Sequence, residues 1–180
     1  MDTDVAGGAP RAPRTPAELL VVMGVAGSGK TTVAALLAGR LGSAFAEGDE
    51  FHSAANVAKM AAGTPLTDED RWPWLAGIRD WLADRAQAGE GAVVPCSALR
   101  RVYRDRLREA GPVRFVHLTG TPALLAGRIQ GRAGHFMPPQ LLTSQLATLE
   151  PLADDEPGLT VDVAERPAEI VDEILRRLVA

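Results

Sequence analysis

One glycine-rich stretch gives the first indication of chemistry in this chain. Residues 24–31 read Gly-Val-Ala-Gly-Ser-Gly-Lys-Thr and fit the pattern G-x-x-x-x-G-K-[ST] at every defined position. Glycines let such a loop wrap so closely that its backbone N–H groups point at phosphate oxygens. The lysine would neutralise the β- and γ-phosphates of ATP, and the final hydroxyl would ligate Mg²⁺. The predicted nucleotide-binding residues are Gly24, Val25, Ala26, Gly27, Ser28, Gly29, Lys30 and Thr31, with Lys30 also catalytic and Thr31 also a metal ligand.

Two carboxylates follow the next short apolar run. Glu47 and Asp49 stand two residues apart after residues 44–46, and side chains at this spacing leave a strand on the same side. One carboxylate would serve the metal's water shell and the other a nucleophilic hydroxyl. We therefore predict Glu47 at the metal and Asp49 as the general base. From the local sequence alone, two solvated loop acids remain the alternative.

These groups need a scaffold, and the chain alternates short apolar runs with amphipathic segments. Such alternation is typical of a parallel sheet covered by helices. The predicted strands are residues 19–23, 44–46, 92–96, 113–118 and 159–163. The predicted helices are residues 30–41 and 97–110, with others beginning at residues 67, 121, 138 and 167. The fold class predicted is therefore α/β.

Length, composition and charge set limits on the function. The chain has 180 residues, which suits one domain, predicted over residues 18–180 after a disordered tail at residues 1–17. Nineteen basic against 23 acidic residues give a net charge of −4, which argues against nucleic acid or an anionic membrane as partner. No run of about 18 apolar residues occurs, so we expect no membrane span. The single cysteine, Cys96, favours a reducing cytoplasm.

The phosphate loop alone leaves the substrate open. A guanine-specific switch normally carries an N-K-x-D motif, which is missing from this sequence. The third predicted strand also lacks the terminal aspartate that is usual in motors. The early acidic pair instead resembles the arrangement in small-metabolite kinases such as shikimate kinase.

Several further segments match one known family. The most specific are residues 56–60, Asn-Val-Ala-Lys-Met, and residues 63–75. The other matching segments are residues 23–31, Gly48-Asp49 with His52, residues 96–99, residues 103–105, Arg128 and Arg132 with Gly134-His135-Phe136, and residues 149–154. In these segments the chain closely resembles the gluconokinase family, which phosphorylates D-gluconate to 6-phosphogluconate, and the resemblance covers residues 19–180. Glu47 departs from the family's more usual aspartate, and Pro95 from a usual strand former.

The resemblance implies roles that the residues taken singly do not. Substrate-binding roles are implied for Asp49, His52, Asn56, Lys59, Arg71, Arg104 and His135, and catalytic roles for Arg128 and Arg132. A substrate cap is expected at about residues 50–66 and a mobile lid at about residues 128–140. Taken alone, Lys59 and His135 read as surface residues, Arg71 as a salt-bridge partner, and Arg104 as part of a solvated stripe with Arg100 and Arg108.

We therefore expect a three-layer α/β/α kinase fold with a five-stranded parallel sheet in the order 2-3-1-4-5. The expected activity is ATP- and Mg²⁺-dependent phosphorylation of gluconate by a cytoplasmic enzyme, and the resemblance implies a homodimer. One alternative is a kinase of another small hydroxy acid such as shikimate. A second alternative, from another class, is a nucleotide-binding regulatory module.

Overall fold

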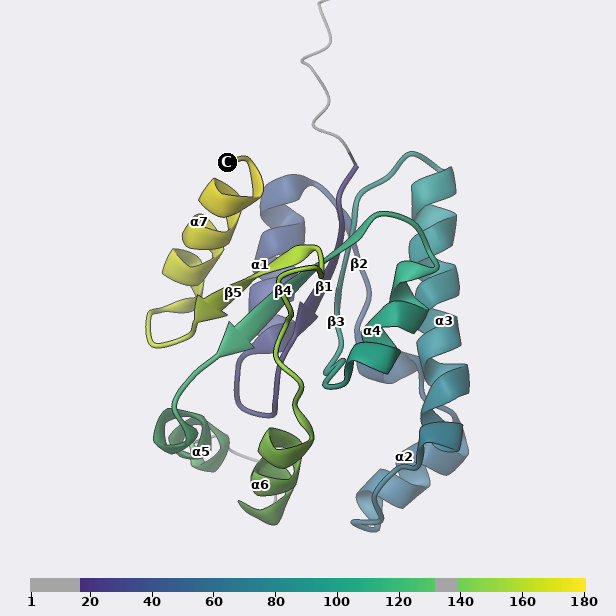
Figure 1. Cartoon of the computed structure of the whole chain (residues 1–180), viewed down its shortest axis with the longest axis vertical. Coiled ribbons are helices and arrows are strands. Elements are labelled where there is room, and N and C mark those ends of the chain that lie inside the picture. The colour runs from purple at the N-terminus through teal and green to yellow at the C-terminus, as the bar shows by residue number, and fades with distance from the viewer. Residues whose placement is uncertain (1–16, 132–138) are drawn as a thin grey trace, which may run out of the picture.

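Five parallel strands form the centre of the structure, a computed structural model that describes residues 17–131 and 139–180 (Figure 1). The strands are β1 (Leu19–Met23), β2 (Ala44–Phe45), β3 (Ala92–Pro95), β4 (Val113–Thr119) and β5 (Gly158–Asp162). They lie in the order β2-β3-β1-β4-β5, and every neighbouring pair is parallel. The predicted fold class and strand order are confirmed.

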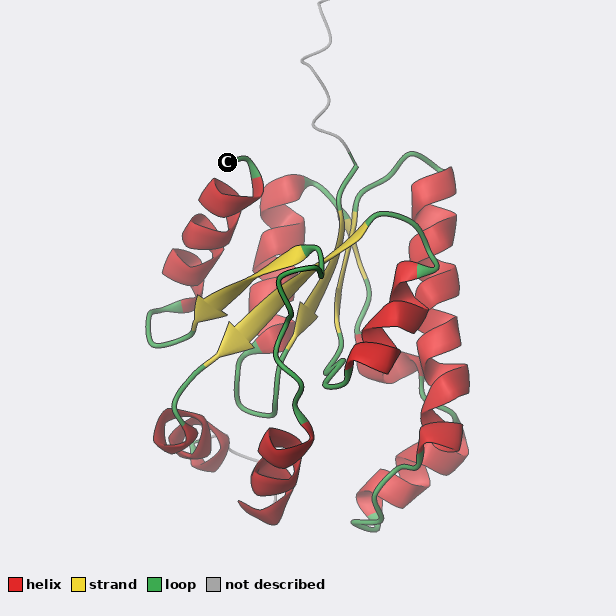
Figure 2. Cartoon of the chain, in the orientation of Figure 1, coloured by secondary structure: helices red, strands yellow, loops and turns green. Residues whose placement is uncertain are grey.

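Helices cover both faces of this sheet (Figure 2). The helices are α1 (Lys30–Leu41), α2 (Ala54–Ala61), α3 (Asp68–Gln87), α4 (Arg101–Arg108), α5 (Pro122–Gln130), α6 (Pro139–Thr148) and α7 (Pro167–Leu178), with a short 3₁₀ helix, η1 (Gly48–Phe51), after β2. α1 and α7 pack together on one face, and α3 and α4 on the other. The result is the three-layer arrangement expected from the sequence.

The core explains why β1 is the central strand. All five of its side chains are buried, and consecutive residues face opposite layers. Leu20 and Val22 pack with the cluster that includes Leu37 of α1. Leu19 and Val21 pack instead with the cluster that includes Ile78 of α3. A strand buried on both sides is a rigid base for the loop that follows it.

The segment after β3 differs from the prediction. A helix was expected from residue 97, but α4 begins at Arg101. Ala98 has a positive φ of 44°, and Ser97 O accepts a hydrogen bond from Gly24 N at 3.3 Å. Arg101 N donates to a carboxylate oxygen of Glu150 at 2.7 Å, where a helix would have paired it with Ser97 O. Tertiary contacts therefore keep this segment as a loop beside the end of β1.

The carboxyl ends of the strands meet at one edge of the sheet, drawn at the bottom of Figure 1. α2, α5 and α6 lie at the same edge. Ligands of open parallel sheets bind outside the carboxyl ends of the strands, so the functional site is expected here. Across the described ranges, no helix is both long enough and apolar enough to cross a membrane. The predicted tail at residues 1–17 lies outside the described residues except for Ala17.

Candidate active site

The glycine-rich loop connects β1 to α1 and holds a defined shape. Gly27 has a φ of +80°, and a Cβ there would lie 2.7 Å from Leu125 O, so only glycine fits. Ser28 Oγ and Lys30 Nζ both donate to Val25 O, at 2.8 and 3.1 Å. Gly29 caps α1, whose amino terminus adds a partial positive charge at the loop. The loop therefore has the backbone shape and the charge of a phosphate-binding site.

A direct contact joins the loop to the acidic pair. Thr31 Oγ1 donates to Glu47 Oε2 at 2.8 Å, and Glu47 Oε1 accepts from Asp49 N at 3.5 Å. A hydroxyl and a carboxylate oxygen are ligands that Mg²⁺ takes, and phosphates and waters usually complete its shell in kinases. The residues present therefore fit this ion. In the ranges that the structure covers, no cluster of three His, Cys, Asp or Glu side chains offers a separate protein cage.

The 3₁₀ helix η1, which contains Asp49, lies very close to the end of β3. A Cβ on Gly48 would lie 2.0 Å from Pro95 O, and Gly48 O accepts from Trp74 Nε1 at 2.8 Å. These contacts fix the backbone on which the exposed Asp49 stands. Burial raises the pKa of Cys96 to about 12, and the charges of Asp49 and Glu47 add to this rise. The charge of Lys30 opposes it.

The predicted cap contains an ordered polar network. The ring of His52 stacks on Trp74 with centroids 4.2 Å apart, and its Nδ1 accepts from Asn56 Nδ2 at 3.2 Å. Asn56 Nδ2 also donates to Asp70 O at 2.8 Å. Burial lowers the pKa of His52, Arg71 adds to this and Asp49 opposes it, so the ring is neutral near pH 7. Asn56 is only 5% exposed, so it holds His52 in position and does not itself face the solvent.

Lys59 lies on the same cap and is bound to α3. Its Nζ donates to both carboxylate oxygens of Asp70, at 3.0 and 2.8 Å. This hydrogen bonding lowers the pKa of Asp70 to about 2. Lys59 therefore joins α2 to the start of α3, and its side chain is still partly exposed.

Arg71 belongs to a cluster that the sequence analysis did not recognise. Tyr103 Oη donates to Asp68 Oδ1 at 2.5 Å, and Arg71 Nη1 donates to Tyr103 Oη at 3.2 Å. Arg100 Nη1 donates to the other oxygen of Asp68 at 3.1 Å. The two guanidinium carbons each lie 5.5 Å from the centre of the Tyr103 ring. Two arginines thus converge on one carboxylate at the start of α3 and α4.

Arg104 corrects a prediction. We expected it to bind the substrate carboxylate, but its side chain has no exposed surface. Its Nε and Nη2 donate to Glu156, and its Nη1 donates to Ala98 O at 2.9 Å. A buried guanidinium with these partners supports the loop after β3. The partner, Glu156, gave no signal in the sequence because it stands 52 residues away.

Arg128, on α5, lies beside the phosphate loop. It lines a cavity of about 260 Å³ with loop residues 27–29 and with Pro167 and Ile170 of α7. Its Nη2 donates to Val163 O. The structure thus places Arg128 beside the loop, on the side where α7 begins, and its catalytic role stays a prediction. Arg132 and His135, the other predicted lid residues, lie outside the described residues.

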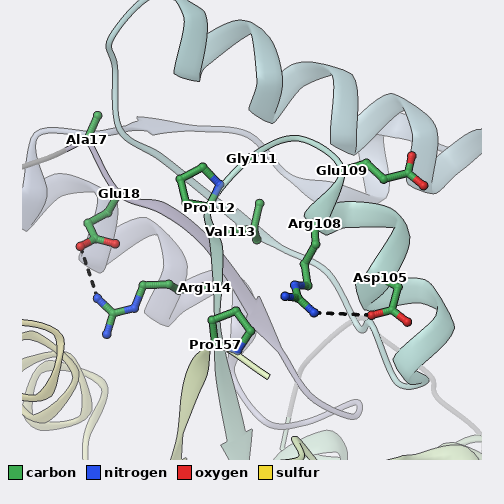
Figure 3. A pocket seen from close by; sticks show the side chains of 10 residues that line it. All are labelled: Ala17, Glu18, Asp105, Arg108, Glu109, Gly111, Pro112, Val113, Arg114 and Pro157. Atoms are coloured by element: carbon green, nitrogen blue, oxygen red, sulfur yellow. Dashed lines mark hydrogen bonds and ion pairs between the residues drawn. The ribbon is translucent and has the colours of Figure 1, made fainter. Parts of the chain in front are cut away.

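A larger cavity, of about 700 Å³, lies away from these groups (Figure 3). Its walls include Glu18 and Arg114, which form an ion pair, and Asp105 and Arg108, which form another. It opens at the amino ends of β1 and β4, opposite the phosphate loop. We place the active site at the carboxyl edge because the phosphate loop, Glu47 and Asp49 are there.

A parallel sheet in this order, with a phosphate loop beside two carboxylates, defines a P-loop kinase. A family model described as an AAA domain matches residues 19–152. A gluconokinase of Gluconobacter oxydans is 54% identical over 162 residues, covering 89% of this chain and 91% of that protein. The thermosensitive gluconokinase of Escherichia coli is 39% identical, covering 91% and 88%. The chain therefore belongs to the gluconokinase family.

Solved structures agree with this assignment. A gluconokinase from Sinorhizobium meliloti has a TM-score of 0.84 at 49% identity, covering 92% of this chain and 94% of that one. Shikimate kinase from Aquifex aeolicus has a TM-score of 0.57 at 17% identity, which shows a shared fold alone. The kinase class and the family predicted from the sequence are confirmed.

Proposed function

We propose that this protein transfers the γ-phosphoryl group of ATP to D-gluconate, giving ADP and 6-phosphogluconate. Membership of the gluconokinase family supports gluconate as the substrate. The observation that carries the chemistry is the contact between Thr31 and Glu47, which brings the acidic pair to the phosphate loop. A regulatory module that only bound a nucleotide would not need this arrangement.

The phosphate loop would bind and orient ATP. The loop amides and the amino terminus of α1 would bind the phosphate oxygens, and Lys30 would neutralise the β- and γ-phosphates. Thr31 and Glu47 would hold Mg²⁺, directly or through water, and the ion would supply further positive charge at the phosphates. Arg128, beside the cavity at residues 27–29, would contact the nucleotide from the side of α7.

Asp49 would act as the general base. Its carboxylate accepts the proton of the gluconate 6-hydroxyl as the bond from O6 to the γ-phosphorus forms. The bond from the γ-phosphorus to the bridging oxygen breaks, and ADP leaves with that electron pair. Because Asp49 is exposed beside Glu47, an acceptor can reach it from the solvent side.

The cap and α3 would bind the acceptor. Arg71 and Arg100 already converge on the carboxylate of Asp68, and a second carboxylate, that of gluconate, can be bound by the same kind of donors. His52 and Lys59 would donate to or accept from the substrate hydroxyls. Asn56 would act through His52, which it orients. These assignments keep most of the predicted substrate residues and leave out Arg104.

Three further features belong to the proposal. Mg²⁺ is supported by the oxygen donors described above. A homodimer rests on the family resemblance alone, and light scattering of the purified protein tests it. A cytoplasmic location is supported by the single, buried Cys96.

A coupled assay of ADP release tests the substrate. Gluconate should support turnover well above that of other sugar acids and of shikimate, and ³¹P NMR should show a phosphomonoester as the product. An enzyme that released ADP with another acid but not with gluconate would keep its kinase class and lose the proposed substrate.

A further inference from the structure

A glutamine of α6 contacts the phosphate loop. Gln145 Oε1 accepts a hydrogen bond of 2.7 Å from the backbone N–H of Ala26, 119 residues away in the sequence. Ala26 is 6% exposed and Gln145 is half-buried, so this hydrogen bond is largely shielded from solvent. Neither the motifs nor the family resemblance drew attention to this residue.

The position of Gln145 is fixed by packing on either side. Leu142 is buried in the core cluster that contains α1, and Leu146 packs against the same cluster. After the helix ends, Glu150 N donates to Leu99 O at 2.7 Å. The last turns of α6 are therefore held between the phosphate loop and the loop that follows β3.

This location is next to the loop that follows β3. The loop after β3 contacts the phosphate loop through the hydrogen bond from Gly24 N to Ser97 O. The 3₁₀ helix η1, which contains Asp49, packs closely against the end of β3. Gln145 is not among the walls of the cavity beside Arg128. The amide of Gln145 thus lies beside Ala26, on a helix whose end is bonded to the loop after β3, close to where η1 packs against the end of that strand.

The hydrogen bond also orients the amide. A backbone N–H needs an acceptor, so Oε1 faces Ala26 and the two hydrogens of Nε2 must point away from it. Nε2 of Gln145 has no hydrogen-bond partner within residues 17–131 and 139–180. The atom is also not buried, because the buried side-chain atoms without a partner do not include it. A fixed donor is therefore presented beside the phosphate loop.

We propose that Gln145 is a substrate-binding residue that donates from Nε2 to a hydroxyl of gluconate next to the reacting one. The phosphate loop orients the glutamine, and the glutamine orients the acceptor against the γ-phosphate. A polyhydroxy acid needs donors and acceptors along its chain, and a fixed amide supplies a directional one. This inference rests on the proposed function.

Two variants separate this role from a structural one. Gln145→Glu keeps an oxygen for the Ala26 N–H but removes the Nε2 donor, whereas Gln145→Met removes both. If the donor binds gluconate, both variants should lower kcat/KM for gluconate by about tenfold or more, the cost of one lost hydrogen bond in the site. Affinity of the Met variant for a non-hydrolysable ATP analogue should stay within about twofold of the parent.

The controls make each outcome decisive. Gln87 is exposed and is the last residue of α3, so Gln87→Glu and Gln87→Met should behave as the parent protein does. A Glu variant with normal kinetics beside an impaired Met variant would show that Gln145 only supports Ala26, and would overturn the inference. Normal kinetics in both folded variants would overturn it as well.

Failure of the proposed function looks different. A parent protein that neither binds gluconate by calorimetry, with the ATP analogue present, nor phosphorylates it would overturn the proposed substrate together with this inference. A parent that is active on gluconate, beside variants equal to it, would overturn the inference alone.

Discussion

Arg104 and Glu156 form an ion pair in which neither side chain has any exposed surface. Nε lies 2.6 Å from Oε1 and Nη2 lies 2.9 Å from Oε2, so the pair is bidentate. Nη1 of the same guanidinium donates to the carbonyl of Ala98, the one non-glycine residue in the described ranges with a positive φ. The pair thus connects α4, the segment before β5 and the loop that supports Gly24.

Glu156→Ala should destabilise the protein strongly, because it leaves a buried guanidinium without its counter-charge. Breaking one side of a buried pair costs about 3–5 kcal/mol, measured here as the free energy of unfolding in urea. Asp155→Ala is the matched control, because Asp155 pairs with Arg101 on the surface and its loss should change the urea midpoint little. Equal, small effects of both changes would contradict a role for the buried pair in stability.

The stability of the protein should fall between pH 6.5 and pH 4. Burial, with a smaller contribution from Arg104, lowers the pKa of His117 from 6.5 to about 4, and His117 Nδ1 has no hydrogen-bond partner in the described structure. The unfolded chain binds this proton in that window and the folded chain does not, so acid favours unfolding. The expected loss is up to about 3 kcal/mol.

Urea unfolding at several pH values measures this loss, with His117→Gln as the comparison. The variant should show a shallower pH dependence because the titrating ring is gone. Part of the slope should remain, since the pKa of His52 is lowered as well. A slope in the variant equal to that of the parent would assign the acid sensitivity to other groups.

The sequence predicted the scaffold better than the contacts between distant segments. Apolar runs and capping residues are local, so the five strands and the phosphate loop could be placed within a residue or two. The start of α4 could not, because the carboxylate of Glu150 and the amide of Gly24 take the groups that would have begun the helix. These partners lie about 50 to 75 residues away.

In the site, too, the sequence predicted local features better than contacts between distant segments. Glu47 and Asp49 follow β2 and the phosphate loop follows β1, and the carboxyl ends of both strands lie at the same edge of the sheet, so the topology alone brings these groups to one edge. Arg104 was misassigned because the burial of a helical arginine depends on which segment covers it. Gln145 was missed because its contact is with a backbone N–H, which leaves no trace in the residue types of either segment.

Glu47→Gln should raise the Mg²⁺ concentration needed for half-maximal turnover. The amide still accepts from Thr31 but has no charge to hold the ion or its waters. ADP release measured against Mg²⁺ at fixed ATP and gluconate gives this concentration, and excess Mg²⁺ should restore much of the rate. A parent-like Mg²⁺ dependence would place the ion on other groups.

Lys30→Ala should nearly abolish turnover while leaving the melting temperature close to that of the parent. The change removes a fixed positive charge from the phosphates, in a site where such charges stabilise the transition state. Lys30 Nζ also bonds Val25 O, so circular dichroism should accompany the kinetics to show that the fold is intact. Substantial turnover in a folded Lys30→Ala protein would contradict the assigned role of the loop lysine.

Asp49→Asn should lower turnover with gluconate by a factor of about 10² to 10⁴, the usual contribution of a positioned base. The amide keeps the size of the carboxylate but cannot accept the proton of the attacking hydroxyl. Affinity for a non-hydrolysable ATP analogue should change little, because the loop, Lys30 and Thr31 are untouched. Glu50→Gln is the matched control, since Glu50 is the next residue of η1 and is also exposed. That variant should retain the parent rate, so a general loss of negative charge around η1 would be excluded as the cause. If Asp49→Asn kept near-normal turnover, the proton would have to leave by another route, and Asp49 would no longer be the base.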